Sequence, residues 1–196
     1  YTADFQKDDN GNRILEYVAG TLVKTVTTDK DGNAVLKNLP LGSYKIVETS
    51  APEGFVLNSE AQTIKFSYKD QETPVIEQTA TFDNERQKVE ISVVKQDADN
   101  EAPVAGAEFG LYAKADIEAH GTVIVEADTL IGTAISDENG KAVFTQDLPF
   151  GEYYIKELAA PNGYVSSDEV IEVKAEYQGQ EVKVVQVACV FKNQPT

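Results

Sequence analysis

The sequence has one cysteine, one histidine and no methionine or tryptophan among its 196 residues. A single cysteine excludes a disulfide within the chain, and one cysteine with one histidine excludes a zinc site built from these two residue types. No apolar run approaches the roughly twenty residues that a membrane-spanning helix needs, so we expect no membrane insertion. Without an initiator methionine or a signal peptide, the sequence is typical of a mature or excised piece of a longer protein.

Positive charge is also scarce. Lysine and arginine together number 17 against 33 aspartates and glutamates, which gives a net charge of −16. Such a charge repels phosphate backbones, so nucleic acid is a poor partner. The composition, 41% hydrophobic and 26% charged, is that of an ordinary folded protein and not of a disordered one.

The chain repeats itself once. Residues 21–55 align with residues 129–164, and the offset grows from 108 to 109 after one inserted residue. A repeat of this length predicts two domains, because each copy is long enough to bury a core of its own. The predicted domains are residues 1–86 and residues 87–196.

The local signals are those of strands. Short runs rich in Val, Ile, Thr and Tyr alternate with turn pairs such as Asp31-Gly32 and Asn139-Gly140, which supply the positive φ angles of tight turns. Helical periodicity is weak throughout, although residues 113–119 could form one turn of helix. The sequence therefore predicts an all-β protein of two tandem immunoglobulin-like antiparallel β-sandwich domains, each with about seven strands.

Three predicted strands carry apolar residues on one face and end that row in a polar residue. Side chains two apart share a face of a strand, so each row points toward the core. An unpaired buried charge is very costly, so the three polar residues should meet if they are buried. They are Lys95 after Val89, Ile91 and Val93; Glu157 after Tyr153 and Ile155; and Asn193 after Val185, Val187, Cys189 and Phe191.

Two interpretations of this pattern are open. In the first, the polar residues lie at strand ends and simply reach water. In the second, they react: a lysine in an apolar pocket has a lowered pKa, and its neutral amine is a nucleophile. A glutamate beside it can hold a proton, polarise the asparagine carbonyl and shuttle protons. Attack of the amine on the side-chain amide releases ammonia and leaves an isopeptide bond between the first strand and the last.

A family resemblance favours the second interpretation. Residues 157–164 (Glu-Leu-Ala-Ala-Pro-Asn-Gly-Tyr) resemble the E-box, E-x-x-A-P-x-G-Y, of Cna B-type domains, also called prealbumin-like or SpaA-like domains. Residues 48–55 carry the same box with phenylalanine in the last place. Residues 93–97 resemble the first strand of the family, residues 104–109 its second strand and residues 191–193 its closing strand.

The resemblance implies a structural stalk or spacer module of a bacterial cell-surface adhesin or pilus-like protein, which is extracellular and lies at the cell surface or cell wall of a Gram-positive bacterium. It implies an isopeptide bond between Lys95 and Asn193 whose formation Glu157 assists, a single-turnover reaction and not an enzyme activity, with no cofactor. The implied partners are neighbouring domains of the same surface protein and an unidentified host ligand. The alternative is a ligand-binding adhesin module, which needs an exposed aromatic or apolar patch.

The first domain departs from the family pattern. Glu48 and Asn84 match the glutamate and the asparagine, but the lysine is uncertain. Aligning the repeat backward places Lys7 after the second strand, so that the lysine-bearing strand would lie upstream of Tyr1. Alternatively, residues 1–7 are themselves the first strand and Lys7 is the nucleophile. The missing Gly-Ala motif of the second strand favours the former.

Other candidate sites are weak. Residues 29–33 and residues 8–12 resemble the start of a calcium loop, but a hairpin turn explains both, and we predict no metal site. His120 lies in a polar loop without a partner nucleophile and is predicted to be a surface residue. Cys189 lies on the apolar face of the last strand and is predicted to be a small core residue.

Overall fold

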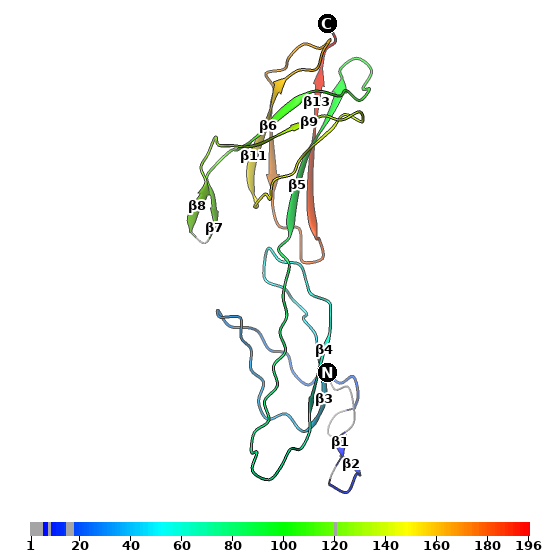
Figure 1. The fold of residues 1–196 in the computed structure, drawn as a ribbon, viewed down its shortest axis with the longest axis vertical. Coiled ribbons are helices and arrows are strands. Elements are labelled where there is room, and N and C mark those ends of the chain that lie inside the picture. Colours follow the sequence, from blue (N-terminus) through cyan, green and yellow to red (C-terminus); the bar gives the residue numbers. More distant parts are fainter. Residues whose placement is uncertain (1–5, 8, 15–17, 120) are drawn as a thin grey trace. The chain divides into compact units, whose positions relative to one another are not determined.

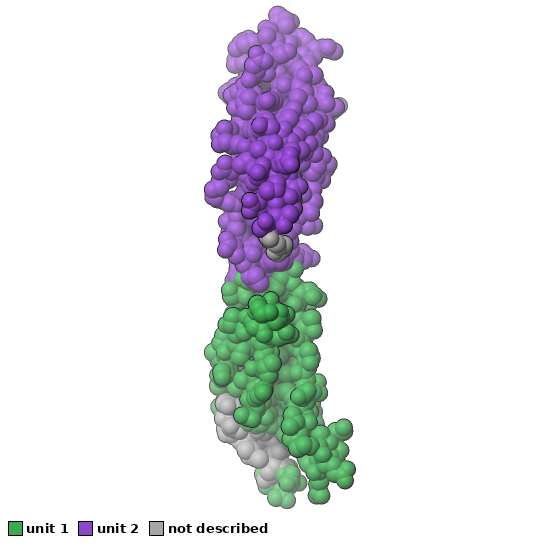
Figure 2. Space-filling model, turned by 90° about the vertical axis from the view of Figure 1, so that its left-hand side faces the viewer, with its two compact units in different colours: residues 1–51, 57–84 green, residues 52–56, 85–196 purple. Residues whose placement is uncertain are grey.

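The computed structural model describes residues 6–7, 9–14, 18–119 and 121–196. The chain divides into two compact units, drawn in different colours in Figure 2. The first unit comprises Tyr1–Ala51 and Leu57–Asn84, and the second comprises Pro52–Val56 and Glu85–Thr196. All regular structure in the described residues is β, which agrees with the predicted fold class, and none of these residues forms a helix able to cross a membrane.

The second unit is a β-sandwich (Figure 1). One sheet has three strands in the order β10-β5-β13, and the other has four in the order β12-β11-β6-β9. A separate hairpin joins β7 to β8. The prediction of a helical turn over residues 113–119 is wrong, because β6 runs up to Ala113 and β7 begins at Ile117. The strands are β5 (Lys88–Asp97), β6 (Glu108–Ala113), β7 (Ile117–Ala119), β8 (Thr122–Val125), β9 (Leu130–Ile135), β10 (Lys141–Phe144), β11 (Gly151–Ala159), β12 (Val170–Ala175) and β13 (Val184–Asn193).

Alternating apolar residues of both sheets form the core of this unit. The predicted inward rows are confirmed: β5 buries Val89, Ile91, Val93 and Lys95, and β11 buries Tyr153 and Ile155. On β13, Val185, Phe191 and Asn193 are buried while Val187 and Cys189 are partly buried against the core. The largest contributions from β6 are Phe109 and Leu111, and Phe109 packs against Phe191 with ring centroids 5.0 Å apart.

One strand pair departs from the antiparallel pattern. The first and last strands of the unit, β5 and β13, run parallel over ten residues each, from Lys88 opposite Val184 to Asp97 opposite Asn193. Parallel neighbours need a long connection, and here the whole sandwich provides it. The register places Phe191 opposite Lys95, so Asn193 lies two residues beyond Lys95 at the same end of the sheet.

The described part of the first unit holds four short strands, fewer than the seven expected. A hairpin joins β1 (Gln6–Lys7) to β2 (Arg13–Ile14), and β3 (Gly42–Ile46) pairs antiparallel with β4 (Gln62–Phe66). In the second unit β5 is the central strand of its sheet, between β10 and β13. The segments of the first unit that are equivalent to β10 and β13 are not strands, and no described strand forms a ladder with them.

Two positions that contact or lie beside β5 in the second unit have more exposed counterparts in the first unit. Ala142 on β10 is 0% exposed, whereas its counterpart Ala34 is exposed. A Cβ atom on Gly140 would lie 2.4 Å from the Lys95 carbonyl oxygen, whereas a Cβ on the equivalent Gly32 would meet no described atom within 4 Å. The repeat is thus preserved in sequence, but the space around the first-strand position differs between the units.

Candidate functional site

Lys95 lies in the core of the second unit. Its side chain is fully buried, and its amine donates one long hydrogen bond, 3.3 Å, to the Gln96 carbonyl oxygen. It makes no ion pair with the described carboxylates, and its Nζ lies 6.0 Å from the centre of the Tyr164 ring. An ammonium has three donors to satisfy. Because this one has a single long bond in a dry environment, the surroundings favour the neutral amine.

Electrostatics act on this amine in both directions. Burial lowers the pKa of Lys95 from its ordinary value, and the negative charges of Glu157, Asp97 and Glu169 offset part of that shift. The net direction is downward, so a larger fraction of Lys95 is a free amine at a given pH than for a lysine in water.

Glu157 and Asn193 form a hydrogen-bonded pair beside the lysine. The Asn193 amide nitrogen donates to both carboxylate oxygens of Glu157, at 2.9 and 2.8 Å, and the Ser167 backbone N–H donates to Glu157 at 2.9 Å. Asn193 is only 2% exposed, and its Oδ1 is buried without a hydrogen-bond partner. A buried carbonyl oxygen without a donor is costly and rare in folded proteins.

The geometry of the sheet places Lys95 within reach of Asn193. The two residues point to the same face of neighbouring parallel strands and are offset by two residues. Two residues along a strand span about 6.6 Å, and neighbouring strands are about 4.8 Å apart, a separation that an extended lysine side chain and an asparagine side chain cover together. The structure therefore brings together the three residues that the sequence singled out.

The first unit contains the same glutamate–asparagine pair. The Asn84 amide nitrogen donates to Glu48 at 2.7 Å, and the Asn58 backbone N–H donates to the same oxygen at 2.7 Å. Asn58 is the counterpart of Ser167, so the two pairs are built alike down to the backbone donor. The backbone of Lys7 pairs with Arg13 in the β1–β2 hairpin. The Lys7 side chain and residues 1–5 lie outside the described residues, so both alternatives for the lysine of this unit remain predictions.

Sequence reasoning missed two residues at this site. The Tyr164 hydroxyl donates a 2.9 Å hydrogen bond to Oδ2 of Asp97, which ends β5 and is 5% exposed. Asp97 continues the inward row of β5 two residues beyond Lys95. That row therefore ends in two polar residues, a signal that was visible in the sequence.

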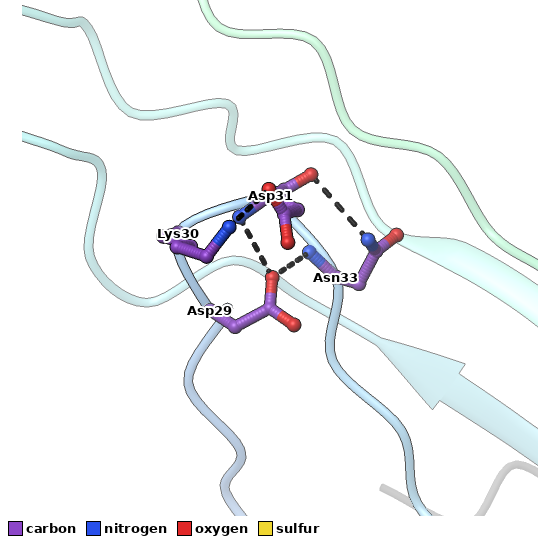
Figure 3. A network of polar contacts seen from close by, with 4 residues as sticks. All are labelled: Asp29, Lys30, Asp31 and Asn33. Atoms are coloured by element: carbon purple, nitrogen blue, oxygen red, sulfur yellow. Dashed lines mark hydrogen bonds and ion pairs between the residues drawn. The ribbon is translucent and has the colours of Figure 1, made fainter.

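Residues 29–33, which resemble the start of a calcium loop and are predicted to be a turn, form a turn whose aspartate side chain accepts backbone hydrogen bonds. Oδ1 of Asp29 accepts hydrogen bonds from the backbone N–H groups of Asp31 and Asn33, at 2.9 and 3.0 Å (Figure 3). Asp137, its counterpart, does the same with Asn139 and Lys141. These bonds agree with the turn interpretation, and no group of three potential metal-binding side chains occurs in the described residues.

The remaining candidates are simple. Asp8, the first residue of the other segment that resembles a calcium loop, and His120 lie outside the described residues. Cys189 is partly buried against the core, and burial raises the pKa of its thiol to about 11. A thiol of this kind is poorly reactive, because the thiolate is the nucleophile.

Comparison with known proteins gives consistent matches. The SpaA family model, described as a prealbumin-like fold domain, matches residues 3–81 and 89–188. The trypsin-resistant surface T6 protein of Streptococcus pyogenes serotype M6 is 28% identical over 137 residues, which cover 65% of this chain and 24% of that protein. The collagen adhesin of Staphylococcus aureus is 39% identical over 77 residues, 39% of this chain and 6% of that protein.

A solved structure, that of the Bacillus anthracis TIE protein, matches with a TM-score of 0.59 and 29% identity. The match covers 87% of this chain and 28% of that one. The chain thus spans about a quarter of the T6 protein and of the TIE structure, and a much smaller part of the collagen adhesin.

Proposed function

The chain belongs to the family of SpaA-type prealbumin-like fold domains, and from this premise we propose that it is a structural module of a bacterial surface pilus or adhesin. We propose further that its second unit is locked by an isopeptide bond between Lys95 and Asn193, formed with the help of Glu157. The observation that carries the proposal is the fully buried Lys95 beside the Glu157–Asn193 pair. The similarity to a surface protein and to a collagen adhesin supports the surface location.

The reaction joins the Lys95 nitrogen to Cγ of Asn193. Lys95 gives one proton to the Glu157 carboxylate, and its side chain turns from the Gln96 carbonyl toward the amide. The neutral amine attacks Cγ, the bond from Cγ to Nδ2 breaks, and the proton held by Glu157 goes to the departing nitrogen. A second proton passes from the new amide nitrogen to Glu157 and from there to solvent or ammonia, so one ammonia leaves for each bond formed.

The orientation of the Asn193 amide bears on the role of Glu157. Its nitrogen, and not its carbonyl oxygen, faces Glu157. This arrangement suits protonation of the leaving nitrogen, which already lies within hydrogen-bond reach of the acid. For Glu157 to polarise the carbonyl, the Asn193 amide would have to rotate by about half a turn. A protonated Glu157 could then donate to Oδ1, which is otherwise buried without a hydrogen-bond partner.

The proposed bond has a direct mechanical consequence within the second unit. Tension that enters at Glu85 and leaves at Thr196 would pass along β5 to Lys95, across the bond and out through Asn193. Residues 96–192 would be bypassed. In a non-covalent pair the same tension would shear the β5–β13 hydrogen bonds, which are individually weak.

Intact mass spectrometry of the folded chain tests the proposal. Each bond lowers the mass by one ammonia, about 17 Da. Lys95→Met removes the nucleophile with little change in side-chain volume. Its measured mass should therefore equal the mass calculated from its own sequence, with no loss of ammonia at Asn193. Peptide mapping should find a branched peptide that joins Lys95 to Asn193. A full sequence mass in the unsubstituted chain would refute the bond.

For the first unit, we propose that Glu48 and Asn84 are the equivalent half of such a site. Their hydrogen bonds to each other and to the Asn58 backbone repeat those of Glu157 and Asn193. Whether a lysine reaches them is decided by the same peptide map, in which a branch at Asn84 identifies the lysine.

A second candidate, ligand binding, is favoured by one observation. The outer face of the four-stranded sheet exposes Leu130 and Leu158, at 48% and 44%. Both side chains lie near Gly110 on the central strand β6. Because one relative is a collagen adhesin, the test is binding of the chain to immobilised collagen. Leu130→Asp with Leu158→Asp should abolish any such binding, and absence of binding by the unsubstituted chain would reject this candidate.

A further inference from the structure

We propose that Tyr164 and Asp97 are positioning residues for the Lys95–Asn193 bond: the Tyr164 hydroxyl fixes the ends of the two reacting strands and withholds Asp97 from Lys95. This inference rests on the proposed isopeptide bond. Two geometric observations carry it, namely the contacts that Tyr164 makes with both strands and the way in which the carboxylate of Asp97 is occupied.

Tyr164 connects the end of β5 to the end of β13. Its side chain reaches β5 through the hydrogen bond to Asp97. Its backbone lies in a turn, residues 161–165, that pairs with the residues after β13: Tyr164 bridges Pro195, and the Val165 N–H donates to the Gln194 carbonyl at 2.9 Å. Lys95 precedes Asp97 by two residues and Asn193 precedes Pro195 by two, so this connection lies directly beside the reacting pair.

The equivalent turn of the first repeat shows that the hydroxyl is not needed to build the turn. Phe55 stands in the place of Tyr164 and bridges Arg86, just as Tyr164 bridges Pro195. The Val56 N–H donates to the Glu85 carbonyl at 2.8 Å, matching the bond of Val165. Phenylalanine therefore supports the same backbone geometry. The Tyr164 hydroxyl is present in the second repeat, where the described residues include the buried Lys95. Its partner, Asp97, lies on the same strand as Lys95.

Both carboxylate oxygens of Asp97 accept hydrogen bonds from groups other than Lys95. Its Oδ1 accepts the backbone N–H groups of Asp99 and Asn100, at 2.8 and 3.2 Å, and its Oδ2 accepts the Tyr164 hydroxyl. The bonds from Asp99 and Tyr164 lower the pKa of Asp97, so it is ionised next to Lys95. Without the hydroxyl, Oδ2 would be available to a lysine ammonium. Such an ion pair would hold Lys95 protonated and directed away from Asn193.

Other charges also face Lys95 and must be considered. Glu157 on β11 and Glu169, in the segment before β12, act on it in the same direction as Asp97. Glu157 is bound to Asn193 and Ser167. Replacing the tyrosine leaves both glutamates unchanged, so a change in the pH dependence of the reaction would report the freed Asp97 oxygen.

The test follows bond formation in the full chain. The chain is made by cell-free synthesis and incubated at pH 5 to 9, and samples are unfolded in guanidinium at intervals, which stops the reaction, and then weighed. Tyr164→Phe should slow the loss of ammonia about tenfold, the effect of losing one hydrogen bond to a charged group in the reacting state. Its rate profile should also move to higher pH.

Two further variants separate positioning from simple structural support. Tyr154→Phe is the matched control, because Tyr154 also donates its hydroxyl to an aspartate, Asp128, at 3.0 Å in the same unit. Its rate and pH profile should be unchanged. Asp97→Asn retains one oxygen that can accept from the turn N–H groups, and its NH2 group can donate to the Tyr164 hydroxyl, which accepts as well as donates. It has no charge to pair with Lys95. The double variant, Asp97→Asn with Tyr164→Phe, should show the same dependence of rate on pH as Asp97→Asn alone.

The outcomes are distinct. A slower reaction, an alkaline shift and restoration by Asp97→Asn support the inference. An unchanged rate in Tyr164→Phe, a slower rate without a shift, or equal slowing in Tyr154→Phe would overturn it. If the unsubstituted chain loses no ammonia at any pH, the proposed bond itself is refuted, and that result is visible before any variant is compared.

Discussion

Replacing Glu157 with glutamine should leave the second unit folded but without its bond. Glutamine has nearly the shape of glutamate and keeps one oxygen, in the place of Oε2, that can accept from the Asn193 amide and from the Ser167 backbone. It cannot take the proton of Lys95 or protonate the departing nitrogen. We therefore expect Glu157→Gln to show the full sequence mass under conditions in which the parent has lost ammonia.

The loss of stability can be estimated from the length of the closed loop. A bond from residue 95 to residue 193 closes a loop of about 99 residues, for which the chain-entropy relation for crosslinks gives about 4.7 kcal/mol. One kcal/mol shifts the melting temperature of a domain of this size by about 4 to 8 °C. The second unit of Glu157→Gln should therefore melt about 19 to 38 °C below the parent.

The assay is differential scanning calorimetry together with intact mass. Lys95→Met provides a second unbonded reference, and Glu152→Gln is the control, because Glu152 is an exposed glutamate on the same strand, β11. Glu152→Gln should keep the bond and the parental melting temperature. The assigned role is wrong if Glu157→Gln loses ammonia at the parental rate. The stability estimate is wrong if the unbonded variants melt with the parent.

Three further predictions concern the turn beside Lys95, the titration of Lys95 and the state of Lys7. Gly140→Ala should destabilise its unit more than Gly32→Ala destabilises the first unit, and it should slow bond formation. Both substitutions place alanine at positive φ, but only Gly140 lies against the Lys95 carbonyl. Equal losses of stability in the two variants would contradict this prediction. In the unbonded Glu157→Gln chain, the free energy of unfolding should rise with pH between the lowered pKa of Lys95 and its ordinary pKa of about 10.4. In that pH range the Lys95 amine is protonated in the unfolded chain but not in the folded chain. Urea titrations should show no such rise once Lys95→Met is added. Peptide mapping should find Lys7 unmodified, and a branched peptide joining Lys7 to Asn84 would show that residues 1–7 are the first strand.

The strand faces could be predicted from the sequence because they depend only on local alternation. Val89, Ile91 and Val93 point inward as that alternation requires, and Lys95 follows them into the core. Asp97 obeys the same rule, because the inward row of β5 continues for one more residue pair beyond Lys95. Its burial therefore also follows from alternation alone.

The parallel pairing of β5 with β13 could not be predicted in this way. Alternation determines which face a residue occupies, but it contains no information on which strand lies alongside or in which direction. The same limit applies to Gly140. Its Asn-Gly turn was expected, but its approach to the Lys95 carbonyl depends on a strand about forty-five residues earlier in the sequence.

The two repeats together show that the glutamate–asparagine pair has a structural role apart from any reaction. Glu48 and Glu157 each accept a backbone N–H ten residues further on, from Asn58 and Ser167, and so close the loop that follows the E-box. The pair alone therefore does not identify a reacting unit, and a buried lysine beside it is the distinguishing feature. Consequently Glu48→Gln, in a unit that mapping shows to be unbonded, measures the structural contribution of the glutamate. Subtracting that loss of stability from the loss in Glu157→Gln isolates the part that belongs to the bond.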